Sequence, residues 1–147
     1  MIRYAVAALA LGAACNKPAA PPPAPRFGDL MTQVARRFEL VGRASLANRW
    51  ELAAFELDEL RETFEDLPRA AVPEDVKADV PTLIKQFVPT IETTLAAALA
   101  KKDPAQLATA FATAAGACNG CHIAVGKPFI EVPTKPGEIV PRLDPLP

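Results

Sequence analysis

The chain has 147 residues, a length that suits one domain, and a formal net charge of −1 at pH 7. This near-neutral balance argues against an electrostatic nucleic-acid binder, which needs a basic patch or stripe. Three cysteines cannot form a disulfide framework, because such a framework needs an even number. Eleven of the 16 prolines lie at positions 18–25 and 128–147, and the stretch between these clusters, which holds the other five, has the composition of packed helices.

The first 14 residues, MIRYAVAALALGAA, are typical of a secretory signal peptide. One arginine precedes an apolar run of about eleven residues, which is shorter than the ~20 residues that a membrane-spanning helix needs. Small residues lead into Cys15, a pattern that resembles the lipobox of bacterial lipoproteins, in which this cysteine becomes lipidated. Ordinary signal cleavage after Ala14 is the alternative, and either event exports the protein.

The segment that follows is predicted to be a tether. Residues 15–26 include NKPAAPPPAP, a composition that favours an extended polyproline II conformation. Asn16 stands where an aspartate indicates inner-membrane retention in some bacteria. We therefore expect a periplasmic protein that a lipid on Cys15 anchors to the membrane, with the outer membrane favoured.

Residues 27–126 are predicted to form an all-α, antiparallel four-helix bundle. Apolar residues recur at spacings of three and four, and the links between segments are short. The predicted helices are residues 27–47, 49–67, 74–102 and 103–126. The predicted core stripes comprise Phe27, Met31, Val34, Phe38 and Val41; Ala53, Leu57, Leu60, Phe64 and Leu67; Val76, Val80, Leu83, Phe87, Ile91 and Leu95; and Leu107, Phe111, Ala114, Cys118 and Cys121.

Prolines and one aspartate mark the helix ends. Pro81 either kinks the third helix or begins a fresh one, and Asp103 is a predicted N-cap with Pro104 at the first helical position. Residues 127–147 are too rich in proline for a helix. We expect them to form an extended tail against the bundle.

Residues 118–122 read Cys-Asn-Gly-Cys-His, the C-x-x-C-H pattern of covalent haem attachment. Two thiols three positions apart share one face of a helical turn, where each S–H can add across one vinyl group of the same haem. His122, the only histidine in the chain, follows directly and supplies an imidazole for the iron. Export agrees with this interpretation, since c-type cytochromes are assembled outside the cytoplasm.

Other interpretations of Cys118, Cys121 and His122 stay open at this point. A thioredoxin-like redox pair belongs in a βαβ context, and none is visible in the sequence. A zinc site takes four ligands, whereas this cluster offers three. A disulfide between the two cysteines leaves the histidine unexplained.

The position of the motif near the C-terminus resembles the class II c-type cytochromes, the family of cytochrome c prime and its low-spin, methionine-ligated relatives. Those proteins are four-helix bundles with haem on the fourth helix, and the resemblance covers residues 27–126. In the low-spin members a methionine of the first helix is the sixth iron ligand. This makes Met31 the candidate sixth ligand, and packing of Met31 in the core is the alternative.

The resemblance implies a haem c protein that transfers electrons to a redox partner. An enzyme is not expected, because the sequence offers no distal histidine and no second histidine or cysteine cluster. Class II members often dimerise through their first two helices, so a homodimer is also implied. The high-spin members leave the sixth position open, and such a protein would bind nitric oxide or carbon monoxide as a sensor or scavenger. A purely structural module would leave the haem motif unused. The residues that would line an open sixth position are Phe27, Leu30, Val34 and Phe38.

Overall fold

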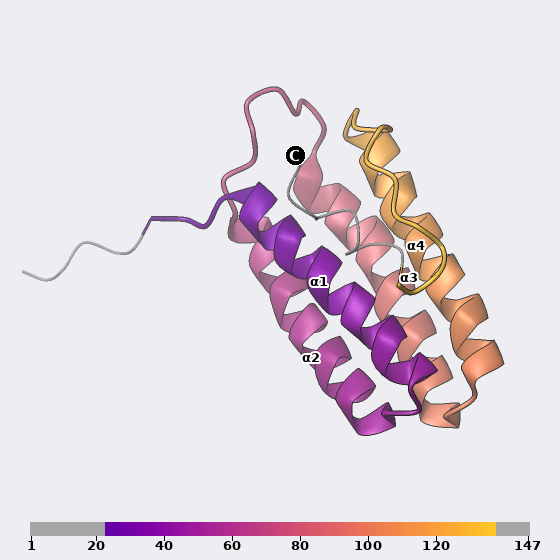
Figure 1. Cartoon of the computed structure of the whole chain (residues 1–147). Helices are drawn as coiled ribbons and strands as arrows, with labels where there is room; N and C mark the ends of the chain where they lie inside the picture. The colour runs from indigo at the N-terminus through magenta and orange to yellow at the C-terminus, as the bar shows by residue number, and fades with distance from the viewer. Residues whose placement is uncertain (1–22, 138–147) are drawn as a thin grey trace, which may run out of the picture.

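The computed structural model describes residues 23–137, which form four antiparallel helices (Figure 1). Helix α1 packs against α2 and helix α3 against α4, so two helical hairpins pair into a bundle. The predicted all-α fold is therefore confirmed. None of the helices in the described range is long and apolar enough to cross a membrane. The elements are α1 (Phe27–Leu46), α2 (Trp50–Asp66), the 3-10 turn η1 (Leu67–Arg69), α3 (Val80–Lys101) and α4 (Pro104–Ala124).

The predicted start of the third helix is wrong, because α3 begins at Val80 and not at residue 74. A helix that began earlier would place Pro81 in its interior, where the proline ring clashes with the carbonyl four residues before it. In the structure Pro81 lies in the first turn, and the Asp79 side chain accepts a hydrogen bond from the Thr82 backbone N–H. Pro81 therefore begins a fresh helix, and residues 70–79 form a loop.

The fourth helix begins as predicted. The Asp103 side chain accepts hydrogen bonds from the backbone N–H groups of Ala105 and Gln106, at 2.8 and 3.1 Å, and Pro104 is the first residue of α4. These bonds satisfy N–H groups that have no partner within the helix.

The core agrees with the predicted stripe of residues 49–67, whose five members are all buried. In the other helices the stripe is buried only in part. Val41, Leu95 and Phe111 have no exposed surface, whereas Met31 and Phe87 are half-buried. The half-buried positions of the stripes are Phe27, Met31, Val76, Leu83, Phe87, Cys118 and Cys121.

Helix α4 ends in a Schellman motif that turns the chain back along the bundle. Gly126 has a φ of +77°, a conformation that glycine adopts without the strain of a side chain. The N–H of Lys127 donates to the carbonyl of His122, and the N–H of Gly126 donates to the carbonyl of Ile123. Residues 127–137, which we call the strap, then run beside α4 without regular secondary structure (Figure 1). Positions 138–147 of the predicted tail lie outside the described residues.

Candidate functional site

A cavity of about 460 Å³ opens between α1, α3 and α4 at the end of the bundle where the α2–α3 loop and the strap lie. Its volume falls within the range of about 300–1,000 Å³ that is usual for ligand and cofactor sites. Most of its lining is apolar. The helical side chains around it include Phe27, Met31, Val34 and Phe38 of α1, Val80, Ile84, Phe87 and Ile91 of α3, and Cys118, Cys121 and His122 of α4.

The structure brings four of the five predicted site residues to this one cavity. Cys118, Cys121 and His122 belong to its α4 wall, and Met31 reaches it from α1. Helices α1 and α4 are far apart in the chain, so only the bundle fold unites the methionine with the C-x-x-C-H segment. The fifth predicted residue, Cys15, lies outside the described residues.

No disulfide joins Cys118 to Cys121 in the structure. Burial raises the pKa of the Cys118 thiol to about 12, with a further contribution from the neighbouring Cys121, and burial also raises the pKa of Cys121. A thioredoxin-like pair needs the opposite shift, because a lowered pKa supplies the nucleophilic thiolate. The environment of these thiols therefore disfavours disulfide exchange.

The His122 ring is oriented by the strap. Its Nδ1 atom lies 2.8 Å from the carbonyl oxygen of Ile130. Because a carbonyl oxygen can only accept a hydrogen bond, the neutral ring that fits this contact carries its hydrogen on Nδ1. Nε2 then keeps its lone pair, as in metal-binding histidines whose other ring nitrogen donates to a carbonyl.

A zinc site gains no support from this arrangement. Within residues 23–137, no three histidine, cysteine, aspartate or glutamate side chains form a group suited to a metal ion. Structural zinc sites use four such ligands around the ion. The cavity instead has two thiols and one imidazole ring in its wall, beside a large apolar space.

Gly120, between the two cysteines, lets α3 approach this segment closely. A Cβ atom at position 120 would lie 2.8 Å from the ring of Phe87, closer than real Cβ contacts allow. The Phe87 ring therefore packs directly on the α4 backbone and borders the cavity beside the thiols. The sequence contained one signal of this contact, a glycine within a helical pattern.

An ion pair joins the two segments at the cavity mouth. The Lys127 ammonium of the strap donates to the Asp75 carboxylate of the α2–α3 loop, and this hydrogen bond lowers the pKa of Asp75. The same loop is tied to the start of α1, where Ala71 exchanges backbone hydrogen bonds with Pro25 and Phe27. The loop and the strap are thus both fixed near the cavity.

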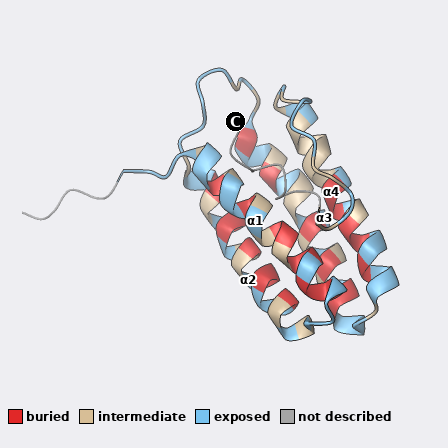
Figure 2. Ribbon diagram, viewed as in Figure 1, coloured by how far each residue is buried: buried red, intermediate tan, exposed pale blue. Residues whose placement is uncertain are grey.

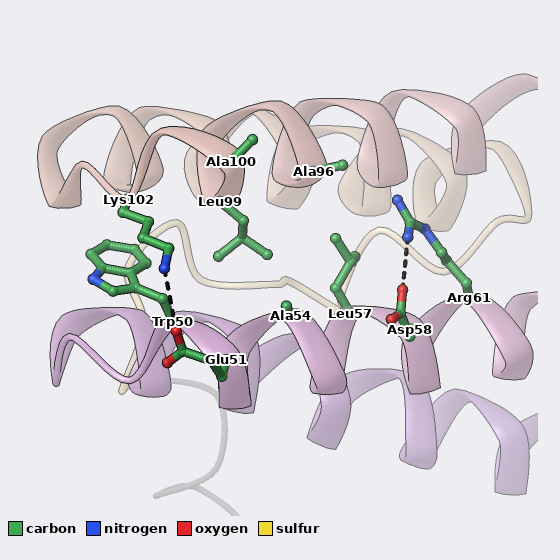
Figure 3. A pocket seen from close by; sticks show the side chains of 10 residues that line it. All are labelled: Trp50, Glu51, Ala54, Leu57, Asp58, Arg61, Ala96, Leu99, Ala100 and Lys102. Carbon is green, nitrogen blue, oxygen red and sulfur yellow. Dashed lines mark hydrogen bonds and ion pairs between the residues drawn. The ribbon is translucent and has the colours of Figure 1, made fainter.

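A second hollow, of about 380 Å³, lies between α2 and α3 (Figure 3). Trp50, Leu57 and Leu99 line it together with small alanine side chains. Two ion pairs border it, Glu51 with Lys102 at 3.2 Å and Asp58 with Arg61 at 2.8 Å. It contains none of the predicted site residues, so the cavity at α4 is the candidate functional site.

Comparison of the chain with protein-family models, with curated proteins and with solved structures gives no match.

Proposed function

We propose that the protein is an exported monohaem c-type cytochrome that transfers electrons. The observation that carries this proposal is the shared position of Cys118, Cys121 and the chain's only histidine on one apolar cavity. Two thiols and an imidazole are the groups that hold haem c, and apolar walls suit a porphyrin ring. The cavity's volume and lining fit a cofactor of this kind.

Each residue has a distinct part in this proposal. Cys118 and Cys121 would hold the haem by thioether bonds, and His122 would bind the iron through Nε2. Met31 would offer its thioether sulfur from the facing helix α1. Bound haem would supply a one-electron iron couple, whose potential a methionine ligand raises. The apolar side chains around the cavity would keep water away from the iron and so also tune that potential.

Location and partners are part of the same proposal. A lipid on Cys15 would hold the protein at a membrane on the periplasmic side, within reach of a redox partner protein. We propose that the protein is not an enzyme. A homodimer through α1 and α2, as the resemblance implies, would be compatible with this role.

Covalent attachment is the first test. The full chain is exported from a host that has a haem-attachment system, and the purified protein is analysed by mass spectrometry and by its visible spectrum in denaturant. We expect one haem per chain, an altered denatured spectrum in Cys118→Ala and Cys121→Ala, and an unchanged one in the control Thr113→Ala. Thr113 is an exposed residue of α4 outside the cavity lining. Absence of haem from the wild-type chain would contradict the proposal.

The sixth ligand is tested with Met31→Leu, which removes the sulfur and nearly preserves the volume. We expect the wild-type protein to be low-spin and to resist carbon monoxide, and the variant to be high-spin and to bind carbon monoxide readily. The matched control is Leu40→Met, at a half-buried α1 position that does not line the cavity. A wild-type protein that is already high-spin would refute Met31 ligation. It would favour the alternative function, binding of nitric oxide or carbon monoxide.

A further inference from the structure

A side chain within the C-x-x-C-H segment holds the strap on α4. The carboxamide of Asn119 donates from Nδ2 to the carbonyl of Val132 at 3.0 Å, and its Oδ1 accepts from the N–H of Val132 at 2.7 Å. Asn119 therefore pairs with both backbone polar groups of one residue, as a neighbouring β-strand would. A paired contact of this kind fixes position and orientation better than one hydrogen bond.

The same two segments meet again at the candidate iron ligand. His122 follows Asn119 by three residues on α4, and Ile130 precedes Val132 by two residues on the strap. The Nδ1 atom of His122 lies 2.8 Å from the Ile130 carbonyl oxygen. One turn of α4 is thus matched to two residues of the strap running in the opposite direction, and the Ile130 carbonyl lies between the Asn119 pair and the turn in which the Ile130 N–H donates to the Lys127 carbonyl.

The strap has few other polar contacts that fix this register. At its beginning, Lys127 bonds to the His122 carbonyl and pairs with Asp75. At its described end, the N–H of Gly137 donates to the buried Glu39 carboxylate at 2.7 Å. Between Ile130 and Gly137, in the range the structure describes, the hydrogen bonds to Asn119 are the polar contacts that join the strap to the helices.

We propose that Asn119 is a positioning residue for His122. By pairing with Val132, Asn119 holds the Ile130 carbonyl against Nδ1, which keeps the ring hydrogen on Nδ1 and the Nε2 lone pair available for a metal. The effect of Asn119 on the His122 ring does not require a bound cofactor. Only the identity of the group that binds Nε2 rests on the proposed cytochrome function.

The single histidine makes the ring directly observable. The full mature chain is labelled with ¹⁵N-histidine and studied by NMR after export. If the chain carries haem, the ferrous form reports how fast the Nδ1 hydrogen exchanges with solvent; if it carries none, the same spectra report which ring nitrogen is protonated. We expect Asn119→Ala to speed the exchange, or to shift the tautomer ratio away from Nδ1–H, by about fivefold, the factor that one typical hydrogen bond contributes.

A second variant keeps the test informative. Asn119→Asp preserves the size and the acceptor for the Val132 N–H but sets a second acceptor oxygen against the Val132 carbonyl, so we expect a change of the same sign as in Asn119→Ala. Thr113→Ala, on the exposed side of α4, should match the wild type. Wild-type behaviour of the ring in both Asn119 variants would overturn the proposal. Unfolding of both would also overturn it, because Asn119 would then stabilise the whole bundle. Haem content is read separately, so failure of the cytochrome proposal is distinguishable from failure of this one.

Discussion

The two ends of the bundle differ in how completely the apolar stripes are buried (Figure 2). We call the end with the α1–α2 and α3–α4 turns the closed end, and the end with residues 70–79 and the strap the open end. Toward the closed end Leu107 is 1% exposed and Phe111 is fully buried, with its ring stacked on Phe38 at 4.1 Å. Toward the open end Met31, Phe87 and Cys121 are half-buried around the cavity.

The connections between the helices account for this difference. At the closed end the chain reverses within residues 47–49 and 102–103, with Asn48 and Lys102 in the left-handed conformation, so each hairpin is held tightly. At the open end α2 and α3 are joined by a turn of 3-10 helix and the loop 70–79, which do not force the helices together. Toward the closed end the apolar stripes therefore form a packed core. Toward the open end they border a cavity that can receive a ligand.

The largest expected effect comes from a matched pair of substitutions at the two ends. Phe111→Ala removes a fully buried ring and should lower the free energy of unfolding by about 3–5 kcal/mol, because a cavity remains where the ring was. Phe87→Ala removes a half-buried ring from the cavity wall and should cost less than half as much. Both values come from chemical denaturation of the full chain.

If the protein carries haem as proposed, its visible spectrum separates packing from binding. We then expect Phe87→Ala, in the cavity wall, to alter the haem spectrum more than Phe111→Ala alters the spectrum of its folded fraction. Equal losses of stability at the two positions would show that the open end is packed as firmly as the closed end.

The sequence predicted the closed end better than the open end, for physical reasons. Helical periodicity and the Asp103 cap are local signals, so the four helices and the buried stripe of α2 could be predicted. Residues 74–79 are wrongly predicted as helix because Val76 falls on the spacing of the third stripe by chance. The contacts of Asn119 with Val132, and of His122 with Ile130, join a helix to an irregular segment. Such contacts leave no periodic trace in the sequence.

A smaller effect is expected from two glycines one turn apart on α4. Gly116→Ala meets no atom within 4 Å and should stabilise the protein by about 0.5–1 kcal/mol, since alanine favours helix more than glycine does. Gly120→Ala meets the Phe87 ring and should be about 1–3 kcal/mol less stable than Gly116→Ala, because the open end must shift to accept the methyl group.

The cause of the stability difference between Gly120→Ala and Gly116→Ala is tested by combining Gly120→Ala with Phe87→Ala. Removal of the ring should relieve the clash, so the losses in unfolding free energy should be less than additive. Additive losses would mean that Gly120 matters for a reason other than its contact with Phe87.

The smallest expected effects are changes in stability at low pH. They distinguish the Asp103 helix cap at the closed end from the Asp75–Lys127 ion pair at the open end. The pKa of Asp103 is lowered first by the side-chain hydrogen bond from Gln106 and then by the backbone N–H groups it caps. The pKa of Asp75 is lowered first by the hydrogen bond from Lys127. A lowered folded-state pKa contributes stability that is complete above the unfolded value of about 3.9 and is lost as the pH falls through the folded value.

In Asp103→Asn and in Asp75→Asn, the midpoint of thermal unfolding should therefore fall less steeply below about pH 4 than in the wild type.

Near pH 7 the two variants should differ from each other. Asparagine caps a helix about as well as aspartate, so Asp103→Asn should change the midpoint little at any salt concentration. Asp75→Asn removes an exposed ion pair, so its small loss at low salt should vanish at high salt because counterions screen that pair. A salt-independent loss in Asp75→Asn would show that the hydrogen bond from Lys127 to the Asp75 carboxylate holds the loop, and not the long-range attraction between the two charges.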